Sequence, residues 1–122
     1  RGCMSVPGVD RAQATVGLLK VLNSLGTLYY NRKKVSEAWN CHSEAAKVFT
    51  EAQKAGLVTD MAMSVMADVY GNMGNEYADF GDYASARMYY NAGLRFCDAL
   101  ENRMPSISRS RRAIERNMAT LR

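Results

Sequence analysis

The single histidine of the chain, His42, directly follows Cys41, and these are the residues whose types come nearest to a metal or nucleophile site. Neighbouring residues of a helix point about 100° apart, so the imidazole and the thiol would not converge on one ion. A zinc site needs three or four converging donors. No such set is evident in the sequence, so we expect no metal and no other cofactor.

Paired carboxylates could support general acid–base catalysis, and Asp79 and Asp82 lie near one predicted turn. A helix cap and a solvated carboxylate account for both residues without catalysis. The chain has no nucleophile elbow, no P-loop and no dinucleotide-binding fingerprint. The sequence therefore favours a non-catalytic protein.

A basic segment ends the chain. Residues 103–122 hold six arginines and one acidic residue, a net charge of +5, whereas the remaining residues carry −1. Such a segment could contact RNA, an acidic protein or a membrane surface. It has no aromatic residue to stack on bases or to anchor in a bilayer. The predicted basic surface comprises Arg109, Arg111, Arg112 and Arg116, and a solvated face that only covers the core is the simpler alternative.

Length and composition describe one all-α domain. The chain has 122 residues, 48% hydrophobic residues and only two prolines. No alternating run of β-branched residues predicts a strand, and no apolar run reaches the roughly 20 residues that span a bilayer. The three cysteines are far apart, which favours a reducing intracellular compartment. The cytoplasm is our first expectation, and the start at Arg1 leaves open an excised domain or a mature mitochondrial protein.

Two stretches repeat one pattern of residues. A large residue, a Leu or Met, a Gly and a Tyr recur at the same offsets, and an Ala follows twelve residues after each Gly; the two sets are Leu22, Leu25, Gly26, Tyr29 and Ala38, and Tyr70, Met73, Gly74, Tyr77 and Ala86. Glycine inside a helix costs roughly 0.5–1 kcal/mol, so two equivalent glycines indicate a packing role. We expect Gly26 to face Ala38, and Gly74 to face Ala86, where paired helices cross.

This pattern resembles the tetratricopeptide repeat (TPR) family, whose helix–turn–helix units stack into a solenoid and bind proteins. In the second unit, the segment F-G-D-Y-A-S-A at Phe80–Ala86 fits the turn between the family's two helices, and Tyr90 fits the aromatic position of the family's second helix. The chain departs from the pattern at His42, at Gly93 and in lacking the closing proline. The glycines are 48 residues apart instead of 34, which implies longer helices, similar to those of kinesin light chain or the Pins-type adaptors.

The resemblance implies two repeats, at about 10–55 and 59–102, and a capping helix at about 106–122. Within them, we expect helices from a capping box at Asp10 to residue 31, over 35–54, from Thr59 or Asp60 to 79, and over 83–102. Lys33 and Lys34 should form the turn after the first helix. Gly56 should end the second helix and Gly81 the third, Asp82 should cap the fourth, and Pro105 should prevent its continuation. The last helix presents an apolar stripe of Ile107, Ile114, Met118 and Leu121. It could instead be the first helix of a third repeat.

In a TPR the first helix of each repeat lines the concave surface. The resemblance therefore implies a peptide-binding groove of Lys20, Asn23, Thr27, Tyr30, Asn31, Asp68, Asn72, Asn75 and Asp79. Asparagine amides both donate and accept hydrogen bonds, which suits a peptide backbone. Gly71 should open space in this groove, while Leu25, Tyr29, Met73 and Tyr77 point into the core.

The expected function is that of a scaffold or adaptor that binds a peptide or helix of another protein. The alternative is a structural subunit of a large mitochondrial or ribonucleoprotein assembly that uses its basic last helix against RNA or an acidic neighbour. We also expect self-association, because two repeats leave an open end at which Val16 and Leu19 should be exposed.

Overall fold

The structure is a computed structural model that describes residues 7–121. Five helices account for most of this range: α1 (Pro7–Asn31), α2 (Val35–Lys54), α3 (Asp60–Asp79), α4 (Tyr83–Leu100) and α5 (Ile107–Ala119). The described residues contain no strand, so the predicted all-α class is confirmed. Cys3 and Arg122, which enter the arguments above, lie outside the described range.

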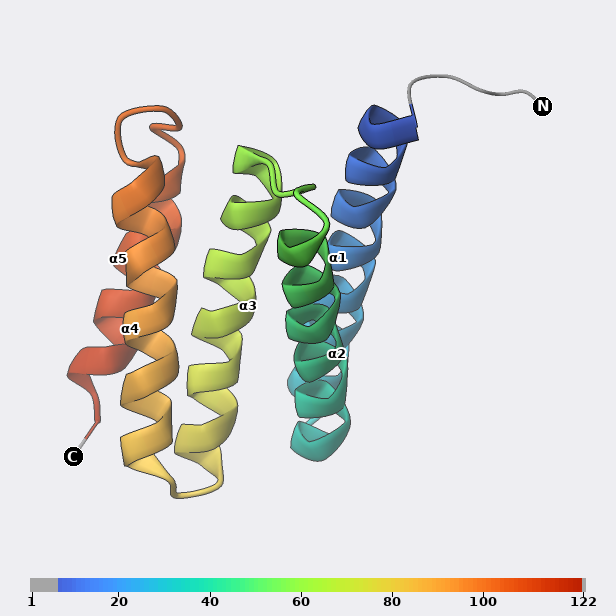
Figure 1. Ribbon diagram of the computed structural model, residues 1–122. Helices are drawn as coiled ribbons and strands as arrows, with labels where there is room; N and C mark the ends of the chain where they lie inside the picture. Colours follow the sequence, from blue (N-terminus) through green and yellow to red (C-terminus); the bar gives the residue numbers. More distant parts are fainter. Residues whose placement is uncertain (1–6, 122) are drawn as a thin grey trace.

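The helices form a row in which α3 is central. Figure 1 shows the α1/α2 hairpin at one end, α3 in the middle, and α4 with α5 at the other end. Helix α3 contacts each of the other four helices, whereas α1 contacts α2 and α3, and α5 contacts α3 and α4. This arrangement buries α3 on two sides and leaves the outer side of α1 without a neighbour among the described residues.

Three turns end their helices in the same way. In each, two successive backbone N–H groups bond back to carbonyls five and three residues earlier, for example Lys34 to Tyr29 and Lys33 to Tyr30. This is the Schellman geometry, which places one residue in the left-handed region. That residue is Lys33 (φ 63°), Gly56 (φ 71°) or Gly81 (φ 87°). The predicted turn at Lys33 and the predicted roles of Gly56 and Gly81 are confirmed.

Side-chain caps also agree with the sequence. The Thr59 side chain accepts a hydrogen bond from Ala62 N (3.1 Å), and Asp82 Oδ1 accepts one from Ser85 N (3.1 Å).

Two helix boundaries were predicted wrongly. Helix α1 already begins at Pro7, since proline fits the first turn, so Asp10 lies within the helix and is not its cap. Helix α4 ends at Leu100, two residues early, where Arg103 N and Met104 N both bond to the Leu100 carbonyl.

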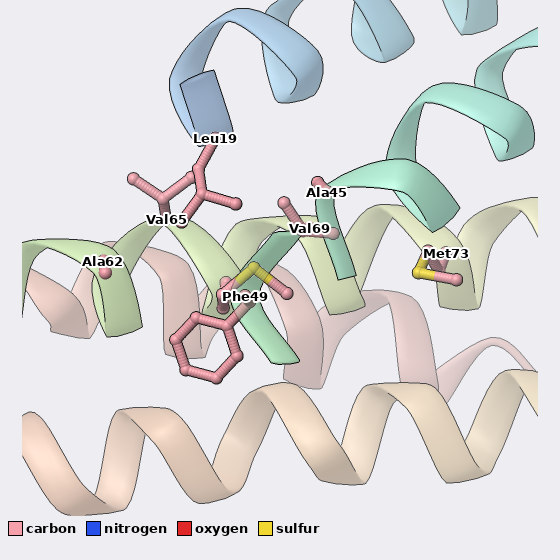
Figure 2. Close-up of a cluster of buried hydrophobic side chains, with 8 residues drawn as sticks. Leu19, Ala45, Phe49, Ala62, Val65, Val69 and Met73 are labelled. Atoms are coloured by element: carbon pink, nitrogen blue, oxygen red, sulfur yellow. The ribbon is translucent and has the colours of Figure 1, made fainter. Parts of the chain in front are cut away.

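Two apolar clusters meet along α3. The first joins α1, α2 and α3 through Leu19, Ala45, Phe49, Ala62, Val65, Met66, Val69 and Met73 (Figure 2). The second joins α3, α4 and α5 through Ala67, Ala86, Tyr90, Cys97, Leu100, Ile107 and Ile114. Ile107 and Ile114 are buried, and Met118 and Leu121 pack at the cluster's edge, so the predicted stripe of α5 is confirmed.

The atoms nearest to a Cβ added at either repeated glycine belong to an aromatic ring, which the sequence did not predict. A Cβ on Gly26 would lie 2.6 Å from His42 Cε1, and a Cβ on Gly74 would lie 2.5 Å from Tyr90 Cδ1. His42 and Tyr90 are themselves 48 residues apart. Ala38 and Ala86 are fully buried, but a flat ring on the facing helix occupies the space over each glycine.

The outer face of α1 also differs from expectation. Leu19 is fully buried and Val16 packs against the first cluster, so neither residue marks an exposed end. We expected both Leu25 and the equivalent residue Met73 to point into the core, but Leu25 is 39% exposed. Leu25 and Met73 differ in exposure because α3 has neighbouring helices on both sides, whereas α1 has neighbouring helices on one side only. Among the described helices, none has the length and hydropathy to cross a membrane.

Candidate binding groove

A hollow of about 250 Å³ lies between α1, α3 and α5. Four of the predicted groove residues line it together with five others, in the set Asn23, Asp68, Gly71, Asn72, Asn75, Ser110, Ala113, Ile114 and Asn117. Helices α1 and α3 were expected to form this surface. The α5 wall was not foreseen, because its approach depends on contacts far apart in the sequence.

Asn72 is the centre of the polar contacts in this hollow. Its Nδ2 donates to Asn23 Oδ1 (3.0 Å), which links α3 to α1. The same nitrogen lies 3.5 Å from Thr27 Oγ1 and 3.5 Å from His42 Nε2. Three predicted residues, Asn23, Thr27 and Asn72, are therefore brought together, and they join a histidine whose partner the sequence did not reveal.

A buried pair, His42 and Glu76, lies beneath the hollow. His42 Nδ1 and Glu76 Oε2 are 2.5 Å apart and both side chains are fully buried. Glu76 Oε1 has no hydrogen-bond partner among the described residues. Burial raises the pKa of Glu76 and nearby Asp79 adds to this, while the His42 hydrogen bond opposes it. A buried carboxyl group with one unpaired oxygen has a desolvation cost, which reduces the free energy of unfolding.

Sequence reasoning missed this pair, although one signal was present. His42 occupies the place that Tyr90 occupies 48 residues later, a position that faces the core, so a polar partner was required there. The partner could not be named in advance. Glu76 corresponds to Leu28 in the first repeat unit, and Leu28 is 48% exposed.

Asn75 forms a hydrogen bond with Tyr90, the residue of α4 that corresponds to His42 in α2. Tyr90 Oη donates to Asn75 Oδ1 at 2.5 Å, and the Tyr90 ring covers Gly74. Burial, with a contribution from the charge of Asp79, raises the pKa of Tyr90 to about 12. The Asn75 oxygen is thus used internally, and its Nδ2 has no bond to the described residues.

The other predicted groove residues lie outside the lining of the hollow. Tyr30 and Asp79 lie near the last residues of α1 and α3, and burial, with a contribution from Asp79, raises the pKa of Tyr30. Lys20 and Asn31 are exposed on α1.

Helix α5 closes one side of the hollow. Ser110 Oγ donates to Asp68 Oδ1 (2.7 Å), which ties α5 to α3. A Cβ on Gly71 would lie 3.0 Å from Ile114 Cγ1. Gly71 lines the hollow as expected, and its missing side chain also makes room for Ile114 of α5.

The predicted basic surface divides into two parts. Arg111 is largely used within the fold, since it pairs with Asp98 (2.5 Å) and Glu101 (3.0 Å) and is only 25% exposed. The exposed residues Arg109, Arg112 and Arg116 have spacing i, i+3, i+7 and share one face of α5. Among the described residues none forms an ion pair with these three arginines, so they make up the available positive stripe.

The hollow can bind by hydrogen bonding. Asn72 Oδ1, Asn75 Nδ2 and the Asn117 amide have no hydrogen-bond partner among the described residues, so the groove offers both acceptors and donors. Nowhere in residues 7–121 do three His, Cys, Asp or Glu side chains come together in a way that could hold a metal ion. Comparisons with models of protein families, with curated proteins and with solved structures each find no match for this chain.

Proposed function

We propose that this protein is a TPR-like interaction module that binds a peptide or helical segment of another protein in the groove between α1, α3 and α5. The observation that carries the proposal is the convergence on one hollow of three groups without a partner among the described residues: Asn72 Oδ1, Asn75 Nδ2 and the Asn117 amide. Amides of this kind recognise a neutral backbone, whose donors and acceptors they can match in pairs. The proposed role is non-catalytic.

The repeat assignment is supported by features that recur at a separation of 48 residues. Lys33 and Gly81 hold equivalent left-handed turns, and the bonds to the carbonyls of Tyr29 and Tyr77 are equivalent as well. The aromatic ring over a glycine recurs too. Helix α5 contacts α4 and α3 as α3 contacts α2 and α1, so it takes the place of the first helix of a further unit.

Charge defines the class of segment that fits. The hollow is lined by one carboxylate, Asp68, and by no Lys or Arg. A peptide carboxylate would find no cation there, and a polyanion would be repelled. The ligand we expect is therefore an internal, uncharged or mildly basic segment and not an acidic C-terminus.

A selected peptide tests this proposal. Peptides of about 15 residues would be selected from a random display library on the protein, and their binding measured by calorimetry. Asn117→Arg, which fills the hollow, should weaken binding at least about tenfold, equal to 1.4 kcal/mol. Asn91→Arg adds the same charge on exposed α4 and should change nothing. Failure to select peptides, or equal effects of both variants, would rule out this groove.

The rival function is a structural subunit that uses α5 against a polyanion, and the Arg109, Arg112 and Arg116 stripe favours it. A single-stranded RNA is the appropriate probe. Binding should weaken steeply with salt if these arginines replace counterions, and triple replacement by Ala should abolish it. Arg111→Ala serves as a control for lost ion pairs within the fold. Peptide binding in the groove should change little over the same salt range.

A further inference from the structure

Four exposed apolar residues form a continuous stripe on the outer side of α1. Leu18, Val21, Leu25 and Leu28 are 46%, 62%, 39% and 48% exposed. Their spacing of three, four and three residues places them on one helix face, and repeats the alternation of a coiled-coil seam. Helix α1 thus has apolar residues on two sides, one toward the core and one toward solvent.

The internal repeat indicates that this face is built to receive a helix. In the second repeat unit, 48 residues later, the positions of Leu18, Val21 and Leu25 are occupied by Met66, Val69 and Met73. Those three residues of α3 are buried in the cluster to which α2 contributes Ala45 and Phe49. The α1 stripe is therefore the counterpart of a surface that an adjacent, oppositely directed helix covers in the same molecule.

We infer that the α1 stripe pairs with the same stripe of a second copy of this chain, the two α1 helices running antiparallel. The stripe is nearly symmetric about position 23: Leu18 and Leu28 lie five residues from it, and Val21 and Leu25 lie two residues from it. A two-fold axis there sets Leu18 against Leu28 of the second copy, and Val21 against Leu25. A self-complementary patch is what an isologous dimer requires.

The flanks of the stripe are compatible with close approach. The residues on one side are Gly17, Ser24 and Asn31, and those on the other are Thr15, Leu22 and Tyr29. None is charged, so no like charges oppose each other at the edge of the contact. At the ends, Ala14 meets Arg32 of the second copy, where the small side chain leaves room for the arginine's aliphatic stem.

The contact is limited in area. With 25 residues, α1 is about 37 Å long, and two such helices bury less than the roughly 1,600 Å² of a standard interface. We therefore expect a weak dimer that dissociates on dilution.

Sedimentation equilibrium from about 1 μM to 1 mM tests the pairing. The protein should pass from monomer to dimer. Leu25→Glu should weaken the dimer at least about tenfold, because a carboxylate would be desolvated against apolar groups. Met88→Glu changes a residue of α4 that is 57% exposed, and should leave association unaltered. Far-ultraviolet circular dichroism would show that each variant folds.

A double variant tests the direction of the helices. In the antiparallel pair, Val21→Glu with Leu25→Lys places a carboxylate opposite an ammonium at both contacts, so this variant should dimerise better than either single variant. A strict monomer at the highest concentration overturns the inference, as does a dimer insensitive to Leu25→Glu. A monomer that instead binds a synthetic peptide of residues 35–54 would assign the stripe to an α2-like helix of another protein.

Discussion

Glu76 gives the protein a specific dependence of stability on pH. Its pKa is raised in the folded state by burial, so the folded protein retains a proton that the unfolded chain releases above the ordinary value of 4.5. The stability contributed by protonated Glu76 is complete below that value. It is lost as pH rises through the higher pKa of the folded state.

Glu76→Gln should remove this loss. The free energy of unfolding of the wild type should fall relative to the variant as pH rises from about 4.5 toward neutrality, because the variant cannot ionise. Urea unfolding at a series of pH values measures the difference. Glu44→Gln, on the exposed face of α2, is the matched control. A difference between wild type and Glu76→Gln that stays constant with pH would contradict the burial argument.

Two glycines should respond oppositely to one added methyl group. Gly74→Ala should lower the free energy of unfolding by about 1–3 kcal/mol, because the new Cβ would press into the Tyr90 ring. Gly17→Ala, in the same helical conformation but with no atom within 4 Å, should raise it by about 0.5–1 kcal/mol. Denaturant unfolding at low concentration, where α1 is unpaired, makes the comparison. Equal effects would show that Tyr90 does not restrict this position.

The residue with the left-handed backbone conformation differs between the two turns that join paired helices. Lys33 and Gly81 hold equivalent left-handed conformations, which are strained for a lysine and free for a glycine. Lys33→Gly should therefore stabilise the protein by about 1 kcal/mol, and Gly81→Lys should destabilise it by a similar amount. Thermal melts of both variants provide the check. A loss of stability in Lys33→Gly would mean that the lysine side chain contributes more than its backbone strain costs.

The whole molecule should unfold as one unit, since α3 contributes to both apolar clusters. Ile114→Ala, in α5, removes a buried side chain and should cost about 2–5 kcal/mol. The only tryptophan, Trp39, lies in α2 and packs edge-on against Tyr77 of α3. Its fluorescence transition should shift as far as the circular dichroism transition. An unchanged Trp39 transition would instead show that the α1/α2 hairpin unfolds independently.

The sequence by itself determined most of the helix boundaries, although not the start of α1 or the end of α4. Gly56, Gly81, Thr59 and Asp82 act within one turn of chain, through backbone conformation and local hydrogen bonds, so their effects could be predicted without neighbours. The spacing of Gly26 and Gly74 likewise indicated two equivalent units. Three predicted asparagines of the groove, Asn23, Asn72 and Asn75, lie together in the structure, although what binds there stays a prediction.

Only the tertiary structure decided which faces are buried and which polar groups meet. Leu25 and Met73 occupy equivalent places in equivalent sequences, yet one is exposed and the other buried, because α3 has helices on both sides and α1 does not. The same asymmetry buries Glu76 against His42 and leaves Leu28 exposed. Local propensity does not carry this information, since burial depends on the number of neighbouring helices and not on the residue's own surroundings in the chain.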